Sequence, residues 1–325
     1  MDDTNIYARL KDLMALQHKA SGFSFLPRQP VHSILSGRHS SRLRGRGLNF
    51  EELRHYRAGD DIRTMDWKVT NRTRKPHVKV FTEERERPVM LLVDQRINMF
   101  FGSQVKLKSV VAAELTAISA WRVLSVGDRV GALIFNDTEI IETRPHRSRK
   151  TVMQILHNLL TLNHKLSADY PDAQNDLMLN KALKETERLS GHDYLIVIIS
   201  DLSGWDEESV KRIKRMARHN DVMVALVFDP LEKTLPESSN LVLSDGQMQI
   251  QVDGTSKDLG EEFTGLFESG VEHLQSELSK HGIPVIPLDT IAPALDQIRE
   301  ALGQQQGKRQ SVKEKSVESQ GVKGR

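Results

Sequence analysis

Hydrophobic and polar positions form a regular pattern from Pro88 to about Leu302. Short, continuously apolar runs, of which Tyr194–Ser200 is the most strongly apolar, are typical of strands buried on both faces of a parallel sheet. Between these runs, apolar residues recur at helical spacing. The expected strands span residues 88–93, 129–135, 194–200, 222–228 and 284–287, and the expected helices span residues 106–124, 147–160, 176–189, 207–218, 263–278 and 292–302. Strands that alternate with helices predict an α/β fold with a doubly wound, mostly parallel sheet.

Two segments of this region alternate between apolar and polar residues instead. Residues 139–143 are expected to pair as an edge strand of the sheet. Residues 240–252 contain two alternating stretches joined at Asp245-Gly246, a dipeptide typical of the turn of a β-hairpin. We therefore expect one edge strand and one hairpin beside the buried strands.

The two ends of the chain depart from this pattern. Residues 3–19 are expected to form one short amphipathic helix. Between Gly37 and about Arg87, arginine and lysine are dense and long apolar periodicity is missing, which indicates a turn-rich attachment with short strands, one of them at residues 77–81. The polar residues at the end of the chain predict a disordered tail. The expected parts are residues 1–86 as N-terminal helix and basic, turn-rich region, residues 87–302 as α/β domain, and residues 303–325 as tail.

The composition excludes several classes of protein. Of the 325 residues 38% are hydrophobic, which suffices for a core, and a formal net charge of only +2 argues against a dedicated nucleic-acid scaffold. Because cysteine is missing, disulfides, thiolate zinc sites and cysteine nucleophiles are excluded. No apolar run approaches the ~20 residues of a membrane-spanning helix, and the N-terminus lacks an apolar signal segment. We therefore expect a cytoplasmic protein without direct membrane insertion.

The motifs of several common enzyme classes are also missing from the sequence. There is no Gly-x-x-x-x-Gly-Lys-Ser/Thr phosphate loop, no Gly-x-Ser-x-Gly nucleophile elbow and no His-Glu-x-x-His metal pair. These absences favour a non-catalytic protein.

A first functional signal lies between residues 37 and 68, where arginines, acids and aromatic residues are interspersed. Its notable residues are Arg57, Gly59, Asp60, Asp61, Arg63, Asp66 and Trp67. Arginine and carboxylate side chains at this spacing can form bidentate pairs, and Trp67 either packs on the main domain or faces a partner. Three interpretations follow: an internally paired structural brace, a partner-docking surface, or a nucleic-acid-binding surface whose basic field the acids dilute.

A second signal lies at the ends of two expected strands. Asp94 follows the run at residues 88–93, and Asp201 follows the run that ends at Ser200. In open α/β sheets ligands bind at the carboxyl ends of the strands. Two carboxylates that converge there can hold a hard cation such as Mg²⁺, which would suit a metal-dependent hydrolase. Alternatively, both residues merely cap the helices that follow.

Several motifs of the chain match those of one bacterial family. They are Gly59–Trp67, Lys79–Glu84, the strand that ends at Asp94, and Gly127–Phe135. In these motifs the chain resembles the domain of unknown function 58 family, from about residue 37 to residue 229 and less closely to residue 302. The resemblance implies that the α/β domain is of the von Willebrand factor A type.

The resemblance also implies a partner. Members of this family are typically encoded beside MoxR-type AAA+ ATPases, which act in the assembly or maturation of protein complexes. Other von Willebrand factor A proteins often belong to the same gene cluster. The resemblance thus implies an adaptor or co-chaperone of such an ATPase, with those proteins as possible further partners.

The family fold usually carries a metal-ion-dependent adhesion site, which this sequence changes. The pattern is Asp-x-Ser-x-Ser after the first strand, a Thr before a middle helix and a later Asp. Asp94 and Asp201 are retained, but Arg96 and Asn98 replace the two serines, and Asn175 lies near the expected threonine. An arginine repels a cation, so the resemblance implies a degenerate site in which the charge of Arg96 replaces the metal. We expect Mg²⁺ to bind weakly or not at all.

The polar tail gives a first testable prediction. Because residues 303–325 offer no apolar face, truncation after Leu302 is expected to leave the melting temperature unchanged in a thermal unfolding experiment. A fall of several degrees would show that the tail packs on the folded protein.

Overall fold

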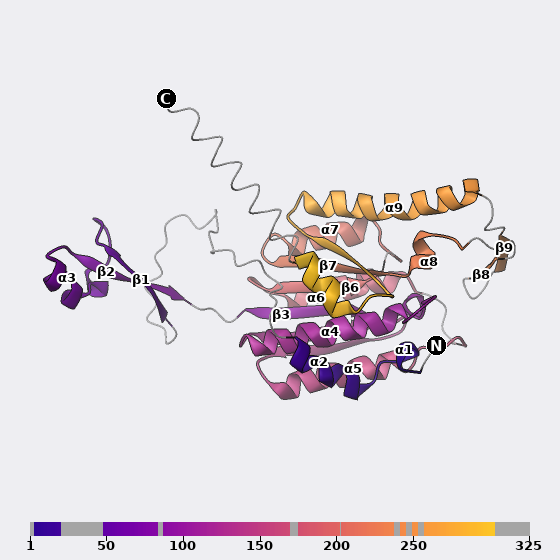
Figure 1. Cartoon of the computed structure of the whole chain (residues 1–325), viewed down its shortest axis with the longest axis horizontal. Helices are drawn as coiled ribbons and strands as arrows, with labels where there is room; N and C mark the ends of the chain where they lie inside the picture. Colours follow the sequence, from indigo (N-terminus) through magenta and orange to yellow (C-terminus); the bar gives the residue numbers. More distant parts are fainter. Residues whose placement is uncertain are drawn as a thin grey trace, which may run out of the picture. The chain divides into compact units, whose positions relative to one another are not determined.

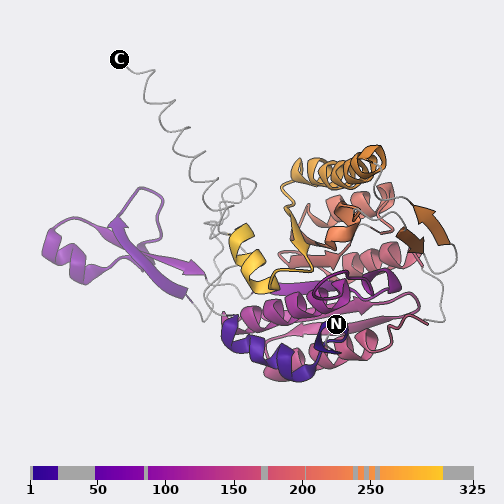
Figure 2. The same cartoon turned by 45° about the vertical axis from the view of Figure 1, so that its right-hand side comes forward.

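The structure, a computed structural model, is shown in Figures 1 and 2. It describes residues 3–20, 48–83, 87–169, 175–201, 203–236, 241–244, 249–252 and 257–302. The chain divides into two compact units, which are treated separately below. The sheet unit comprises Met1–Arg28 and Arg87–Arg325. The other unit comprises Gln29–Glu86 and is called the hallmark unit because it contains the family hallmark, the motif Gly59–Trp67.

The sheet unit is built on one six-stranded sheet. Its strands are β3 (Pro88–Asp94), β4 (Arg129–Phe135), β5 (Ile140–His146), β6 (Leu195–Ser200), β7 (Asp221–Phe228) and β10 (Val285–Asp289). Their order is β10-β7-β6-β3-β4-β5. All neighbours are parallel except β4 and β5, so the predicted edge strand is confirmed as an antiparallel one. The predicted α/β fold with a mostly parallel sheet is confirmed as well.

Helices cover both faces of this sheet because its central strands are apolar on both sides. The main helices are α4 (Lys108–Ser125), α5 (Arg149–Asn163), α6 (Leu177–Leu189), α7 (Glu207–Met216), α9 (Lys257–Ser279) and a last helix over residues 294–302. Alternate residues of β3 point to opposite faces: Leu91 packs in the core with α4 and α5, and Leu92 packs in the core with α6 and α7. Figures 1 and 2 show these layers.

The N-terminal segment belongs to the sheet unit. The sequence pattern groups it instead with the turn-rich region up to residue 86. The segment forms two helices, α1 (Asp3–Ile6) and α2 (Leu10–Lys19), so the prediction of a single helix is wrong. The interruption lies where the backbone N–H of Ala8 donates to the side chain of Asn163 at 2.9 Å. Leu13 on α2 is buried, and its carbonyl accepts a 3.0 Å hydrogen bond from the indole of Trp121. These long-range contacts anchor the segment on α4 and α5.

The hallmark unit contains a two-stranded antiparallel sheet and one short helix. Its elements are β1 (Leu48–His55), the 3-10 turn η1 (Ile62–Thr64), α3 (Trp67–Thr73) and β2 (His77–Glu83). The strand predicted at residues 77–81 is confirmed as part of β2, whereas α3 was not predicted. Among the side chains described in this unit, only that of Val78 belongs to a buried hydrophobic residue.

Smaller elements complete the described chain. They are η2 (Ile97–Met99), α8 (Pro230–Lys233), and the hairpin strands β8 (Leu241–Ser244) and β9 (Gln249–Val252). The two strands pair antiparallel, which confirms the predicted hairpin, while Asp245-Gly246 and residues 303–325 lie outside the described residues. Within the described part of the chain, no helix combines the length and the apolar character needed to cross a membrane.

The docking of α2 generates a prediction with a control on the same helix. Leu13→Ala removes a side chain that is 1% exposed, so it is expected to lower the free energy of unfolding by about 2–5 kcal/mol. Leu10→Ala, at a position that is 39% exposed, is expected to cost about 0.5 kcal/mol or less. Urea denaturation measures both values. Equal effects would contradict the observed packing of α2.

Candidate functional site at the carboxyl edge of the sheet

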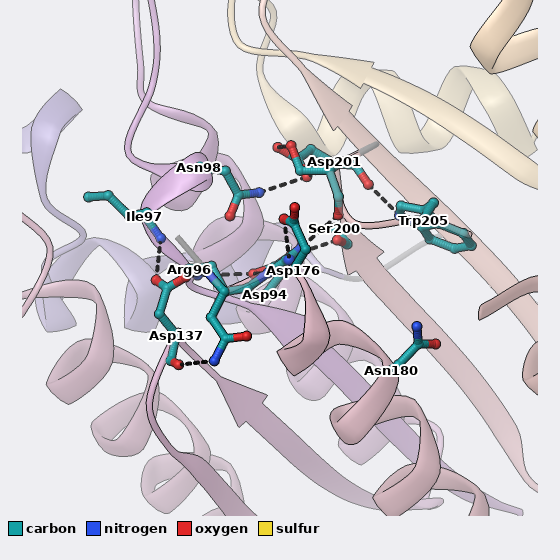
Figure 3. A network of polar contacts seen from close by, with 12 residues as sticks. Asp94, Arg96, Ile97, Asn98, Asp137, Asp176, Asn180, Ser200, Asp201 and Trp205 are labelled. Carbon is teal, nitrogen blue, oxygen red and sulfur yellow. Dashed lines mark hydrogen bonds and ion pairs between the residues drawn. The ribbon is translucent and has the colours of Figure 1, made fainter. Parts of the chain in front are cut away.

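The carboxyl ends of β3 and β6 bring the two predicted aspartates to one edge of the sheet. Asp94 is the last residue of β3, and Asp201 directly follows β6. These strands are neighbours and parallel, so their ends lie together. Figure 3 shows the two carboxylates within one network of polar contacts. Asp94 is 0% exposed and Asp201 is 3% exposed.

Asp94 is paired entirely with groups of its own chain. The guanidinium of Arg96 contacts it closely, with Nη2 at 2.7 Å from Oδ2 and Nε at 3.1 Å from both oxygens. The backbone N–H of Arg96 donates to Oδ1, and the hydroxyl of Ser200 donates to Oδ2 at 2.7 Å. Arg96 is also 0% exposed, and its Nη2 donates to the carbonyl of Ser203 at 2.9 Å. The residue expected to replace a metal therefore forms a buried ion pair with Asp94.

Asp201 has a different cation, which the sequence analysis missed. Lys108 Nζ lies 2.7 Å from Asp201 Oδ2 and 2.5 Å from Glu232 Oε1. The other oxygen, Oδ1, accepts hydrogen bonds from Asn98 Nδ2 at 2.8 Å and from the backbone N–H of Ser203 at 2.9 Å. Lys108 is 1% exposed at the first turn of α4. No local pattern in the sequence distinguishes it from an ordinary surface lysine at a helix terminus.

The ionisation of this pair follows from burial and from opposite charge. Burial alone would lower the pKa of Lys108, but the charges of Asp201 and Glu232 outweigh it, so this pKa is raised. Burial alone would raise the pKa of Asp201, but Lys108 and the hydrogen bonds lower it. Both groups are therefore held in their charged forms. Burial raises the pKa of Glu232 above its ordinary value, and Lys108 counteracts only part of that effect.

A third carboxylate, Asp137, lies just after β4 and was not predicted. It accepts backbone hydrogen bonds from Ile97 at 2.7 Å and from Asn175 at 2.9 Å. Burial raises the pKa of Asp137. Asn175, predicted as a degenerate ligand, thus contacts Asp137; its side-chain amide donates to the carbonyl of the same residue at 3.1 Å. Asp137 connects the loop after β3 to the segment before α6.

The residues at this edge do not fit a divalent cation. Each oxygen of Asp94 and of Asp201 accepts a hydrogen bond from the chain itself. Two buried cationic side chains lie where metal ligands would have to converge, and like charges repel. Among the described residues, no group of three His, Asp or Glu side chains is arranged to hold a metal ion.

The predicted hallmark residues lie in the other unit, where the acids among them accept hydrogen bonds. Arg54 binds Asp60 in a bidentate pair with both distances at 2.8 Å, and Asp60 also accepts from the backbone of Arg57. These contacts lower the pKa of Asp60. Gly59 has a φ of +104°, which favours glycine at this turn.

The remaining hallmark acids cap local elements. Asp61 accepts from the backbone of Arg63 at the start of η1. Asp66 accepts from the backbone of Val69 at the start of α3, an arrangement that lowers its pKa. Trp67, which the sequence analysis expects to pack on the main domain or to face a partner, is 61% exposed.

Comparison with known proteins gives a family and relatives of unknown activity. The profile of the family described as "Protein of unknown function DUF58" matches residues 52–269. Uncharacterized protein Rv1480 of Mycobacterium tuberculosis is 30% identical over 227 residues, which cover 69% of this chain and 68% of that protein. Uncharacterized protein Mb1516 of Mycobacterium bovis matches with the same identity and coverage.

Two solved structures match this chain at low sequence identity. The conserved hypothetical protein BatB from Bacteroides thetaiotaomicron is 14% identical, with 67% of this chain and 98% of that chain covered and a TM-score of 0.39. The SpRpn10 VWA domain is 11% identical, with 66% and 94% covered and a TM-score of 0.33. The strand order and the two helical layers described above are those of an α/β domain with a mostly parallel sheet.

The carboxylate of Asp137 gives a prediction about the edge. Asp137→Asn removes one of two acceptors for backbone N–H groups, so it is expected to lower the free energy of unfolding by about 1–3 kcal/mol. Asp169→Asn, at an exposed position of the same unit, is the control and is expected to change it by about 0.5 kcal/mol or less. Chemical denaturation of both variants tests this, and an Asp137 effect as small as the control would contradict it.

Proposed function

This chain belongs to the family described as "Protein of unknown function DUF58", and on that premise we propose that it is a non-catalytic protein-interaction module. The proposed role is that of an adaptor or co-chaperone of a MoxR-type AAA+ ATPase in the assembly or maturation of protein complexes. Other von Willebrand factor A proteins of the same gene cluster are proposed as further partners, and the cytoplasm as the place of action.

The carboxylates at the carboxyl edge of the sheet are fully paired, which favours a protein-binding function over a catalytic one. A metal-dependent hydrolase needs a metal with open coordination positions or a carboxylate that is free to act as a base. The carboxylates of Asp94 and Asp201 are instead buried and engaged by Arg96 and Lys108. This arrangement makes the hydrolase the weaker alternative.

The exposed apolar side chains of the hallmark unit carry the proposal. Trp67 is 61% exposed and Ile62 is 60% exposed, and both lie within the family hallmark. Large aromatic side chains in water are unfavourable, and tryptophan is enriched among the residues that dominate protein interfaces. We therefore assign the docking surface to Ile62, Trp67 and the exposed cations described next.

Charge further defines the proposed partner. Between residues 62 and 75, five exposed cations form no ion pair with another described residue: Arg63, Lys68, Arg72, Arg74 and Lys75. They complement an acidic surface. A nucleic acid would also attract these cations, but Asp61 lies exposed among them and an exposed isoleucine has no role in contacts with phosphate. The observations therefore favour a protein partner.

The test replaces the proposed anchor in the full chain. Trp67→Ala is expected to weaken binding to the MoxR-type AAA+ ATPase of the same organism by about 30-fold or more, since a hot-spot residue contributes at least about 2 kcal/mol. Isothermal titration calorimetry with ATP present measures the affinity. The melting temperature is expected to stay unchanged because the side chain is exposed.

A control variant separates a specific anchor from a general apolar effect. Leu177→Ala removes a side chain that is 78% exposed on the sheet unit and is expected to bind the ATPase normally. Equal affinity of the wild type and Trp67→Ala would refute the assigned surface. Binding of single-stranded DNA that weakens steeply with salt would instead support the nucleic-acid alternative.

A further inference from the structure

We propose that Arg96 and Lys108 together replace a divalent cation at the carboxyl edge of the sheet, so that the chain's own charges hold this edge and no metal is required. Arg96 alone was anticipated from the sequence; the second cation and its bridging position come from the structure. The inference concerns the sheet unit and is independent of the docking surface proposed above.

Charge balance is the first argument for two cations. Asp94 and Asp201 stand at the ends of adjacent strands in a nearly water-free place. A buried carboxylate without a cation or hydrogen bonds is strongly unfavourable, and two of them would also repel each other. A single Arg96 bound through Nε and Nη2 satisfies Asp94 but makes no hydrogen bond to Asp201. Lys108 supplies the charge that Asp201 needs.

The position of Lys108 is the second argument. Its ammonium bridges Asp201 and Glu232 at 2.7 and 2.5 Å, as an ion with two oxygen ligands from separate segments of the chain would do. Glu232 lies on α8 after β7, and Asp201 follows β6, so the ammonium connects the ends of two strands through the start of α4. This is the structural task that a bound metal performs in a loop cluster.

The oxygens around Lys108 would suit a cation if the ammonium were removed. Asp201 and Glu232 would then face the vacated position with uncompensated charges. Oxygen donors of this kind are the ligands that Mg²⁺, Mn²⁺ and Ca²⁺ prefer. Loss of Lys108 should therefore convert a site that needs no metal into one at which a bound metal stabilises the folded protein.

The main experiment compares the full-length wild type with Lys108→Ala by thermal unfolding in EDTA, in millimolar MgCl₂ and in millimolar MnCl₂. The wild type is expected to have the same melting temperature in all three. Lys108→Ala is expected to melt about 10 °C lower in EDTA, since removal of one partner of a buried ion pair is strongly destabilising. Mn²⁺ is expected to restore part of that loss.

Lys106→Ala is the matched control. Lys106 lies two residues earlier and pairs with Glu114 at 2.5 Å, but both side chains are partly exposed. Its replacement is expected to lower the melting temperature by only about 2 °C, with no response to Mn²⁺. A Lys108→Ala effect no larger than this, or a Lys108→Ala protein that gains nothing from Mn²⁺, would overturn the substitution of a metal by Lys108.

The wild type provides a test that does not depend on the folding of any variant. Calorimetric titration with Mg²⁺ and Mn²⁺ is expected to give no stoichiometric binding. Tight binding with a stoichiometry of one, or a melting temperature that falls in EDTA, would overturn the proposal. If Lys108→Ala does not fold, Lys108→Gln, which keeps most of the side-chain volume, replaces it in the comparison. Its melting temperature is expected to rise with Mn²⁺, and a lack of response counts against the proposal in the same way.

Discussion

Burial of the Asp94–Arg96 ion pair is the constraint on which the carboxyl edge of the sheet depends. Both side chains are 0% exposed, and taking two charges out of water is favourable only when their geometry is good and the remaining donors and acceptors are satisfied. Ser200 and the carbonyl of Ser203 meet that requirement for one carboxylate oxygen and one guanidinium nitrogen. The loops after β3 and β6 are therefore fixed to each other by electrostatics as well as by packing.

The same constraint supports the proposal that this domain binds a partner and does not catalyse a reaction. In open α/β sheets the carboxyl edge is the usual place for a ligand. Here Arg96 and Lys108 compensate the charges of Asp94 and Asp201, and these buried cations disfavour the binding of a metal there. The proposed docking surface lies in the hallmark unit, where Trp67 and several cations are exposed. In the proposed function, recognition is therefore a property of the hallmark unit.

The sequence predicted most of the sheet unit because its signals are local. Apolar runs and helical periodicity depend only on which face of an element is buried, and strand ends place Asp94 and Asp201 once the sheet is parallel. The features that the sequence did not predict depend mainly on contacts between residues distant in sequence. The break between α1 and α2 coincides with a hydrogen bond from Ala8 to Asn163, and α3 is too short to show a period. Lys108 was missed because its two acidic partners lie 93 and 124 residues away.

The most direct measurement of the central claim is anomalous X-ray diffraction from crystals of the full chain grown with Mn²⁺. The account predicts electron density for the Arg96 guanidinium against Asp94 and for the Lys108 ammonium between Asp201 and Glu232, with no anomalous peak at either place. An ordered Mn²⁺ peak coordinated by Asp94 or Asp201, with Arg96 or Lys108 displaced, would contradict it.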